Sequence, residues 1–245
     1  MGTLTVLPVA PPRQPVGGRV AGVAMALAPV AVLPLAVVAG LVVWAGDAVL
    51  APPLLIGALA VAVLALGSGG LHLDGLADTA DGLAVPGDVG RRLDVMRSGD
   101  VGPVGAATVV LVILLQASAI GGVLDRHTGP DAAIAVGVAV VVSRGCLSIG
   151  CARGVPAARV EGLGSAVAGT VPVAGVALVV LALAAVALLL DGGRGLAGVV
   201  LVVVSAALVV LTACRRLGGV TGDVLGAVVE VSLTAFLVVQ AVGLQ

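Results

Sequence analysis

The sequence has no lysine, no asparagine and no tyrosine, and aromatic residues make up only 1% of it. Without lysine the chain offers no Schiff-base amine, so any phosphate must be held by Arg, Ser, Thr, His or backbone N–H groups. Charged residues are 10% of the chain and the net charge is −1, so binding to nucleic acid is not indicated. Cys146, Cys151 and Cys214 lack the spacing of a metal site and are interpreted as small buried hydrophobic residues.

Apolar residues make up 60% of the chain, and the mean hydropathy is +1.27. No polar stretch is long enough to build a soluble core, so residues 1–245 are predicted to form a single integral membrane domain. Segments near the ~20 residues that span a bilayer predict an all-α, polytopic bundle of about seven transmembrane helices. These segments are approximately 20–44, 50–66, 104–124, 132–150, 170–190, 195–213 and 224–243. Pro29 and Pro34 predict a kink or break in the first segment, and Pro52 and Pro53 suit the first turn of the second.

The arginines predict how this bundle is oriented, because cytoplasmic segments of membrane proteins carry an excess of positive charge. With the N-terminus in the cytoplasm, nine arginines lie in inner segments, and only Arg126 and Arg194 lie in outer ones. The outer loops are then short, at about 45–49, 125–131 and 191–194. The longest inner segment is an acidic loop at about 67–103. We therefore expect the chemistry on the cytoplasmic side.

The acidic segment contains "GGLHLDGLADTADGL", residues 69–83. Asp74, Asp78 and Asp81 have the spacing i, i+4, i+7, which places them on one face of a helix. Like charges at this spacing repel one another unless a cation binds, and oxygen ligands of this kind suit Mg²⁺. The alternative is a solvated acidic loop, although the interleaved leucines give the segment an apolar face that a loop does not need. His72 lies on another face and is a candidate general base, a phosphate donor or a satisfied polar group.

Two further polar clusters fall in predicted inner segments. The first contains Arg144, Arg153, Arg159 and Glu161, and the second contains Arg215, Arg216, Thr221, Asp223 and Glu230. The arginines are also explained as positive-inside anchors, but Arg144 lies within an apolar span, where a charge is costly and usually functional. Glu230 lies two turns into the last span and needs a partner if it is buried. Clusters from separate loops on one side are typical of a composite active site.

The three motifs "GGLHLDGLADTADGL", "ARVEGLG" and "GGVTGDVLGAVVE" resemble, in order and separation, those of the cobalamin synthase (adenosylcobinamide-GDP ribazoletransferase) family. The resemblance covers nearly the whole chain. It implies a multi-pass enzyme of the bacterial inner membrane whose active site faces the cytoplasm. Such an enzyme requires Mg²⁺ and joins adenosylcobinamide-GDP to α-ribazole or its 5′-phosphate, releasing GMP.

The site residues are predicted by combining the resemblance with the charge clusters. The resemblance assigns catalysis to His72, Asp74, Asp78 and Asp81, with the three aspartates holding Mg²⁺. Residues predicted to bind substrate are Arg97, Arg144, Arg153, Arg159, Glu161, Thr221, Asp223 and Glu230. Many family members read Met-Lys-Asp-Ser-Arg-Ile-Gly after the acidic segment, whereas this chain reads "MRSGDVG" at 96–102. Arg97 replaces the lysine charge, and the Asp-Ser-Arg run is missing.

Two other functions fit parts of the pattern. A membrane CDP-alcohol-type phosphotransferase shares the Asp-Gly start of "DGLADTADG", but the Ala-Arg pair and downstream aspartate spacing of that family are absent. A small-solute transporter usually has charges near the middle of its spans, and here only Arg144 and Glu230 qualify. The predicted partners are the corrinoid nucleotide, α-ribazole and the lipid bilayer, with oligomerisation possible.

Overall fold

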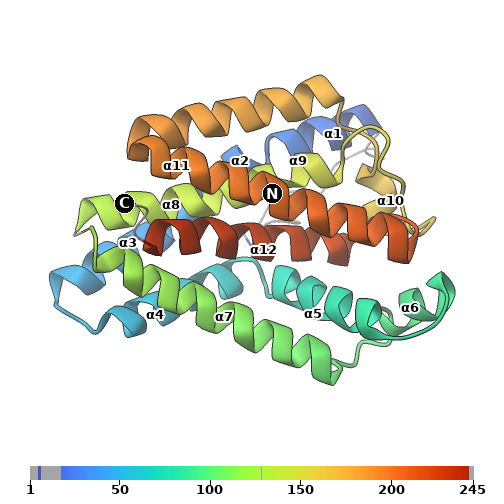
Figure 1. The fold of residues 1–245 in the computed structure, drawn as a ribbon, viewed down its shortest axis with the longest axis horizontal. Coiled ribbons are helices and arrows are strands. Elements are labelled where there is room, and N and C mark those ends of the chain that lie inside the picture. The colour runs from blue at the N-terminus through green and yellow to red at the C-terminus, as the bar shows by residue number, and fades with distance from the viewer. Residues whose placement is uncertain (1–4, 7–17, 128, 243–245) are drawn as a thin grey trace.

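The computed structural model describes residues 5–6, 18–127 and 129–242. Every regular element in these ranges is a helix, which confirms the predicted all-α class. The longer helices lie side by side and form an elongated bundle (Figure 1). The elements are α1 (Gly18–Ala26), α2 (Ala28–Ala31), α3 (Leu33–Ala48), α4 (Pro53–Gly67), α5 (Leu71–Ala84), α6 (Val89–Val95), α7 (Pro103–Leu124), α8 (Pro130–Gly145), α9 (Leu147–Gly150), α10 (Leu163–Val167), α11 (Val173–Leu217) and α12 (Gly222–Ala241).

Prolines divide the N-terminal part of the bundle as the sequence predicts. The first apolar segment is broken into α1, α2 and α3, and a proline stands in the first turn of both α2 and α3. Pro52 is the N-cap of α4 and Pro53 is its first residue. Proline lacks an N–H and fixes φ, so it is tolerated at the start of a helix but not within one.

Helix α5, which carries the aspartates, follows α4 after a sharp bend. The two helices meet at 90°, and Gly70 precedes α5 with a φ of +75°, a left-handed conformation that glycine adopts without strain. The predicted acidic loop at 67–103 therefore contains two helices, α5 and α6.

The long helix α11 is a hairpin of two arms. Asp191 and Gly192 have non-helical backbone angles, and the chain reverses its direction there (Figure 1). A side chain at Gly195 would collide with the carbonyl of Ala187 across the turn, so the arms approach closely. The two arms correspond to the predicted segments 170–190 and 195–213.

Within the described residues, four helical stretches are long and apolar enough to cross a membrane: α7, α8 with α9, α11 and α12. The bent pair α4–α5 would make a fifth. This confirms a membrane helix bundle. The count of about seven, which treats the arms of α11 separately and includes the α1–α3 segment, stays a prediction, as does the side on which the N-terminus lies.

The core of the bundle is built from small aliphatic residues, as the scarcity of aromatic residues requires. Ala139 and Val140 of α8, Val202 and Ala206 of α11, and Val228 of α12 are fully buried in one cluster. Large apolar side chains also cover the outside, where lipid would meet them.

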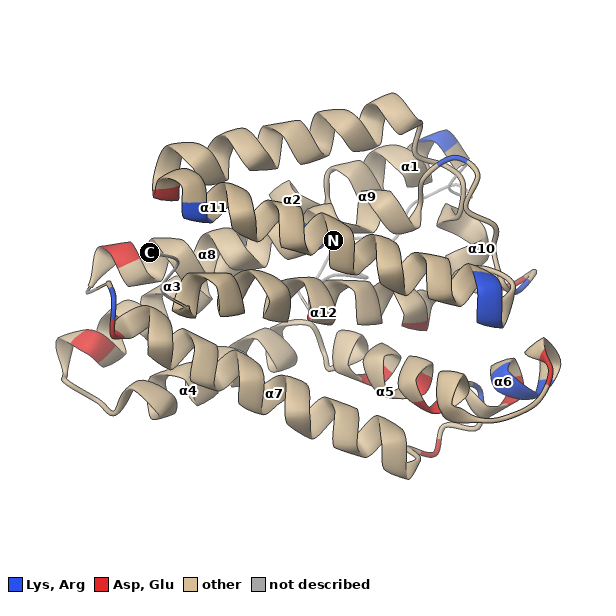
Figure 2. Ribbon diagram, in the orientation of Figure 1, with Lys and Arg blue, Asp and Glu red and all other residues tan. Residues whose placement is uncertain are grey.

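Charged residues gather at the two ends of the bundle (Figure 2). The predicted outer loops share one end, where the Gly129 N–H donates to Asp47, and α5, α6 and α10 lie toward the other.

Candidate active site

Glycines allow α5 to pack against the start of α12. A Cβ atom at Gly75 would lie 2.7 Å from the carbonyl oxygen of Asp223, and one at Gly226 would lie 3.1 Å from that of His72. Any larger residue at Gly75 would force the two helices apart. This contact sets Asp223, in the first turn of α12, beside the acidic face of α5.

Asp78 lies at the centre of the acidic group. Its pKa is raised to about 6, first by partial burial and then by the negative charges of Asp74, Asp223 and Asp81, while Arg159 acts in the opposite direction. The structure therefore brings Asp223 and Arg159, from two distant motifs, to the aspartates of α5. Asp74 is exposed and Asp78 is half-buried, so a substrate can reach both.

Asp81, which is predicted to bind the metal, caps a neighbouring helix. Only 7% of it is exposed, and its carboxylate accepts hydrogen bonds from the N–H groups of Gly102 (2.7 Å) and Gly105 (2.8 Å). These N–H groups are at the start of α7, where the helix leaves its first donors without partners. Asp81 thus caps α7 from α5, with both carboxylate oxygens engaged.

The donor set suits a metal held by few protein ligands. In the described part of the chain, no group of three or more His, Cys, Asp or Glu side chains is placed to hold one ion. Mg²⁺ is commonly bound by one or two carboxylates together with water and substrate phosphates. Asp78, with Asp74 or Asp223 beside it, offers that number of ligands.

The loop before α10 supplies the arginine of the site. The N–H of Ala158 donates to the carbonyl of Val220 (3.0 Å), which ties this loop to the segment leading into α12. Arg159 donates to the carbonyl of Leu93 (2.9 Å) and lies 3.6 Å from the carboxylate of Asp223. Thr221 caps α12 by accepting from the Val224 N–H, and its hydroxyl is 3.1 Å from Asp223. Asp223 is thereby held from two sides.

Three residues predicted to bind substrate do not join this group. The side chains of Arg97, Arg153 and Glu161 are exposed, and among the described residues they form no hydrogen bond or ion pair. They are free to meet a ligand, and their role stays a prediction.

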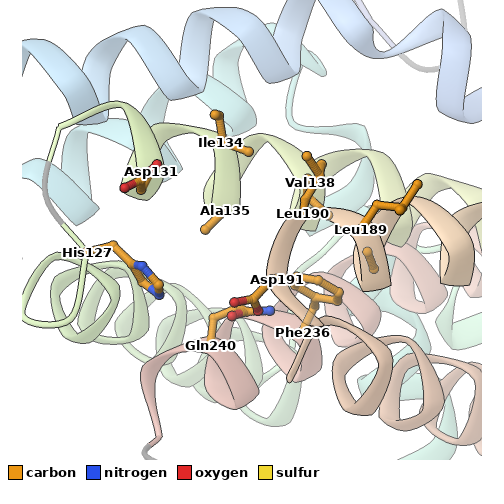
Figure 3. A pocket seen from close by; sticks show the side chains of 11 residues that line it. His127, Asp131, Ile134, Ala135, Val138, Leu189, Leu190, Asp191, Phe236 and Gln240 are labelled. Carbon is orange, nitrogen blue, oxygen red and sulfur yellow. The ribbon is translucent and has the colours of Figure 1, made fainter. Parts of the chain in front are cut away.

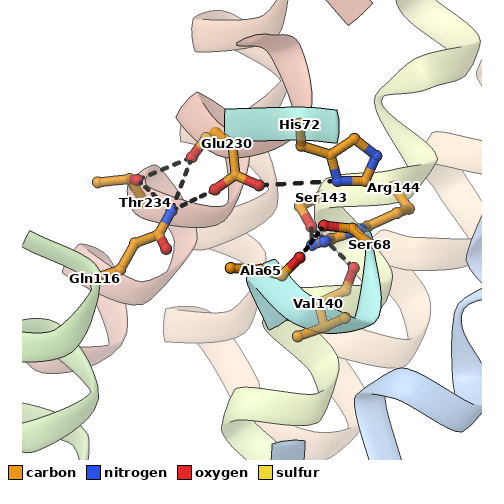
Figure 4. Close-up of polar contacts among 9 residues, drawn as sticks. All are labelled: Ala65, Ser68, His72, Gln116, Val140, Ser143, Arg144, Glu230 and Thr234. Atoms are coloured by element: carbon orange, nitrogen blue, oxygen red, sulfur yellow. Dashed lines mark hydrogen bonds and ion pairs between the residues drawn. The ribbon is translucent and has the colours of Figure 1, made fainter. Parts of the chain in front are cut away.

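His72, Arg144 and Glu230 form a separate polar group inside the bundle (Figure 4). Arg144 is fully buried and Glu230 is 5% exposed. His72 Nδ1 lies 3.8 Å from Glu230 Oε1, and Arg144 Nη1 donates to the hydroxyl of Ser143 (2.9 Å). In this arrangement Arg144 and Glu230 lie inside the protein, behind the acidic face, without an ion pair between them among the described residues. Their predicted contact with substrate stays a prediction.

Two residues of these groups were missed by the sequence reasoning. Gln116 of α7 is 1% exposed and donates to Glu230 Oε2 (2.8 Å), so it orients that carboxylate. A lone glutamine within an apolar span was the signal for it. Arg92 donates to the carbonyls of Leu83 and Gly87 and so holds the turn after α5, a role that has no sequence pattern.

The fold and this site define a multi-pass membrane protein that concentrates carboxylates and an arginine at one end of an apolar helical bundle. The family model described as cobalamin-5-phosphate synthase (CobS) matches residues 1–241. The chain belongs to this family.

Curated relatives agree with this assignment. A protein of Nocardioides sp. named adenosylcobinamide-GDP ribazoletransferase is 47% identical over 241 residues, which is 98% of this chain and 96% of the relative. Proteins of the same name from Frankia casuarinae and Pseudomonas fluorescens are each 41% identical, covering 97% and 81% of this chain and 91% and 81% of their own lengths. No solved structure matches the chain.

Proposed function

We propose that this protein is an adenosylcobinamide-GDP ribazoletransferase. It joins adenosylcobinamide-GDP to α-ribazole, or to its 5′-phosphate, and releases GMP. The observation that carries the proposal is the meeting of Asp78 with Asp223 and Arg159, because these residues come from the three motifs that resemble the family. The names of the relatives support the same reaction.

The reaction needs positioning and charge neutralisation more than covalent chemistry by the protein. The ribose hydroxyl oxygen of α-ribazole attacks the phosphorus that carries the corrinoid, the bond from that phosphorus to the GMP oxygen breaks, and GMP leaves. Arg159 is the cation beside the acidic group and would meet the phosphate oxygens. The hydroxyl proton passes to a carboxylate of the acidic group that does not hold the metal, which is Asp74 or Asp223.

Magnesium is part of the proposal. Asp78 would hold the ion together with Asp74 or Asp223 and the substrate pyrophosphate. When bound, Mg²⁺ neutralises charge that develops on the phosphate oxygens. Asp81 is left out of the ion's ligands because both of its oxygens cap α7.

The proposed location is the bacterial inner membrane, with the acidic face of α5 toward the cytoplasm. The excess of arginine in the segments around this face supports the orientation. Both substrates would then reach the site from the cytoplasm.

The proposal is tested by GMP release from adenosylcobinamide-GDP and α-ribazole with the purified protein, in Mg²⁺ and in EDTA. We expect release only with both substrates and Mg²⁺. Asp78→Asn keeps the size of the side chain and is expected to lower the rate by on the order of 10²-fold or more, the usual effect of losing one electrostatic stabiliser.

Asp88→Asn is the matched control for the same change of charge. Asp88 is exposed and caps α6 by accepting from the Arg91 N–H, a role that asparagine fills as well. The rate of GMP release by Asp88→Asn should stay near that of the wild type. Absence of GMP from the wild-type protein under all conditions would overturn the proposed function, and full activity in EDTA would overturn the role of Mg²⁺ alone.

A further inference from the structure

A polar cavity lies at the end of the bundle remote from the aspartates. It has a volume of about 410 Å³ and is bordered by α8, the turn of α11 and the end of α12 (Figure 3). His127, Asp131, Asp191 and Gln240 bring polar groups to it, and its other walls are apolar. Asp81 caps the start of α7 and His127 follows its end, so the two sites are separated by the length of α7, roughly 33 Å. This cavity is therefore distinct from the candidate active site.

Several polar atoms of this cavity have no partner within the described residues. Gln240 is 0% exposed, yet neither its amide oxygen nor its amide nitrogen is hydrogen-bonded. Asp191 Oδ2 and His127 Nε2 are likewise buried without a partner. In Figure 3 the side chains of Asp191 and Gln240 lie together at the cavity. A buried polar group without a hydrogen bond is costly, which indicates that a ligand completes these contacts.

The chemistry of the ligand follows from these groups. Asp131 and Asp191 give the cavity negative charge, and neither carboxylate forms an ion pair among the described residues. The open acceptors are the oxygens of Asp191 and Gln240, and the amide nitrogen of Gln240 is an open donor, so the complement is a cation with N–H donors that stands beside an acceptor oxygen. A primary ammonium group beside a phosphate oxygen has these properties, whereas a quaternary ammonium has no N–H, and a head group without a cation would leave the two carboxylates unneutralised.

An apolar groove continues from this cavity along the bundle. Its volume is about 830 Å³, it lies among α3, α8 and α11, and it shares Ile134, Val138 and Leu190 with the polar cavity. Along α8 it runs from Pro130 to Val142, roughly 18 Å of helix. That length is close to half of the ~30 Å hydrocarbon core, which is the depth of one leaflet. The groove thus has the length of a lipid chain whose head group lies at the polar cavity.

We propose that these two cavities form one binding site for a phospholipid with a primary ammonium head group. The ammonium donates to Asp191 and Gln240 in the polar cavity, and one acyl chain lies in the groove. Charged residues mark this end of the bundle as the membrane surface, which is the depth at which a head group lies (Figure 2).

Trp44 makes the proposal testable by fluorescence. It lines the groove, and it is the single tryptophan of a chain that has no tyrosine. Its emission therefore reports on that groove, and a lipid with a brominated acyl chain quenches it on contact. The purified protein is placed in phosphatidylcholine liposomes that contain small mole fractions of brominated phosphatidylethanolamine, phosphatidylglycerol or phosphatidylcholine. We expect half-maximal quenching by phosphatidylethanolamine at a mole fraction about tenfold lower than for the other two, as one charge-assisted hydrogen bond would give.

Variants separate the head-group contacts from the groove. Asp191→Asn and Gln240→Leu should each remove the preference for phosphatidylethanolamine while leaving non-selective quenching in place. Gly137→Leu fills the groove, where a Cβ atom meets only Ala36 O at 3.7 Å, and should weaken quenching by every lipid. Gly175→Leu is the matched control, because a Cβ there also has only ordinary contacts and lies outside both cavities.

Equal quenching of the wild-type protein by all three lipids would mean ordinary surrounding lipid and would overturn the proposal. A preference that survives in both Asp191→Asn and Gln240→Leu would also overturn it, because the head group would then be held elsewhere. Monodisperse gel filtration of each variant shows that it is folded, and either head-group variant alone suffices if the other fails this check.

Discussion

Replacing Asp81 by asparagine tests whether this carboxylate supports the fold or holds the metal. Asp81 accepts two backbone hydrogen bonds, from Gly102 (2.7 Å) and Gly105 (2.8 Å), with one oxygen each. Asparagine keeps one acceptor but turns an NH₂ group toward the other N–H, so one bond is lost and the remaining one loses its charge assistance. Bonds to charged groups contribute about 1.5–3 kcal/mol each, and neutral ones about half of that. We expect Asp81→Asn to lower the free energy of unfolding by about 2–4 kcal/mol.

The measurement is an unfolding titration with SDS in mixed micelles, carried out with and without Mg²⁺. Asp74→Asn is the control, because Asp74 is exposed, lies on the same helix and undergoes the same change of charge. We expect Asp74→Asn to unfold like the wild type in the absence of Mg²⁺ and Asp81→Asn to be destabilised equally in both media. If Asp81→Asn unfolds like the wild type but loses GMP release and the response to Mg²⁺, the capping role is wrong and Asp81 belongs among the metal ligands.

Three further predictions concern charge and orientation. Burial and neighbouring carboxylates raise the pKa of Asp78 to about 6 in the folded protein, against 3.8 as the ordinary value. In EDTA, the contribution of Asp78 to the free energy of unfolding should be fully present below about pH 4 and should be lost as the pH rises through 6. Asp78→Asn should remove this pH dependence in unfolding titrations. In a cysteine-free background, an impermeant maleimide should label Ser98→Cys only from the cytoplasmic side. It should label Gly193→Cys only from outside. The opposite result would reverse the predicted topology. Arg144→Ala leaves Glu230 buried without a nearby cation and should lower the free energy of unfolding by about 3–5 kcal/mol. Adding Glu230→Gln should recover part of this loss. If nothing is recovered, the two charges are not coupled.

Much of the fold could be predicted because its determinants are local. Apolar length, the prolines at 29 and 34 and the pair at 52 and 53 predicted where helices begin, break and end, and the structure agrees. The spacing of Asp74, Asp78 and Asp81 predicted a helix with an acidic face, and α5 is that helix. The reversal at Asp191 and Gly192 could also be placed, because a short polar stretch interrupts two apolar runs.

The site was less predictable because its contacts join residues far apart in the chain. Helical spacing puts Asp81 on the same face as Asp78, but it does not show that the N–H groups of Gly102 and Gly105 take its carboxylate. The charge of Glu230 indicated that a partner was needed, but not that Gln116 would be one, since 114 residues separate them. Sequence patterns show which groups need a partner, and only the packing of α5, α7 and α12 decides which partner each one meets.

The hairpin form of α11 has a consequence for how the protein enters the membrane. The two apolar arms pack closely where Gly195 meets Ala187. They can therefore leave the translocation machinery as a pair, and each arm already satisfies its own backbone hydrogen bonds. On the predicted topology the turn must then be carried across the bilayer, where a single charged residue costs about 2.5–3.5 kcal/mol at the centre. Asp191 and Arg194 stand three residues apart in this turn, and no ion pair joins them among the described residues, so each charge has to cross by itself. Replacing either residue by a neutral one would remove one such cost, so it should raise the amount of protein inserted during synthesis while leaving the activity of each inserted molecule unchanged.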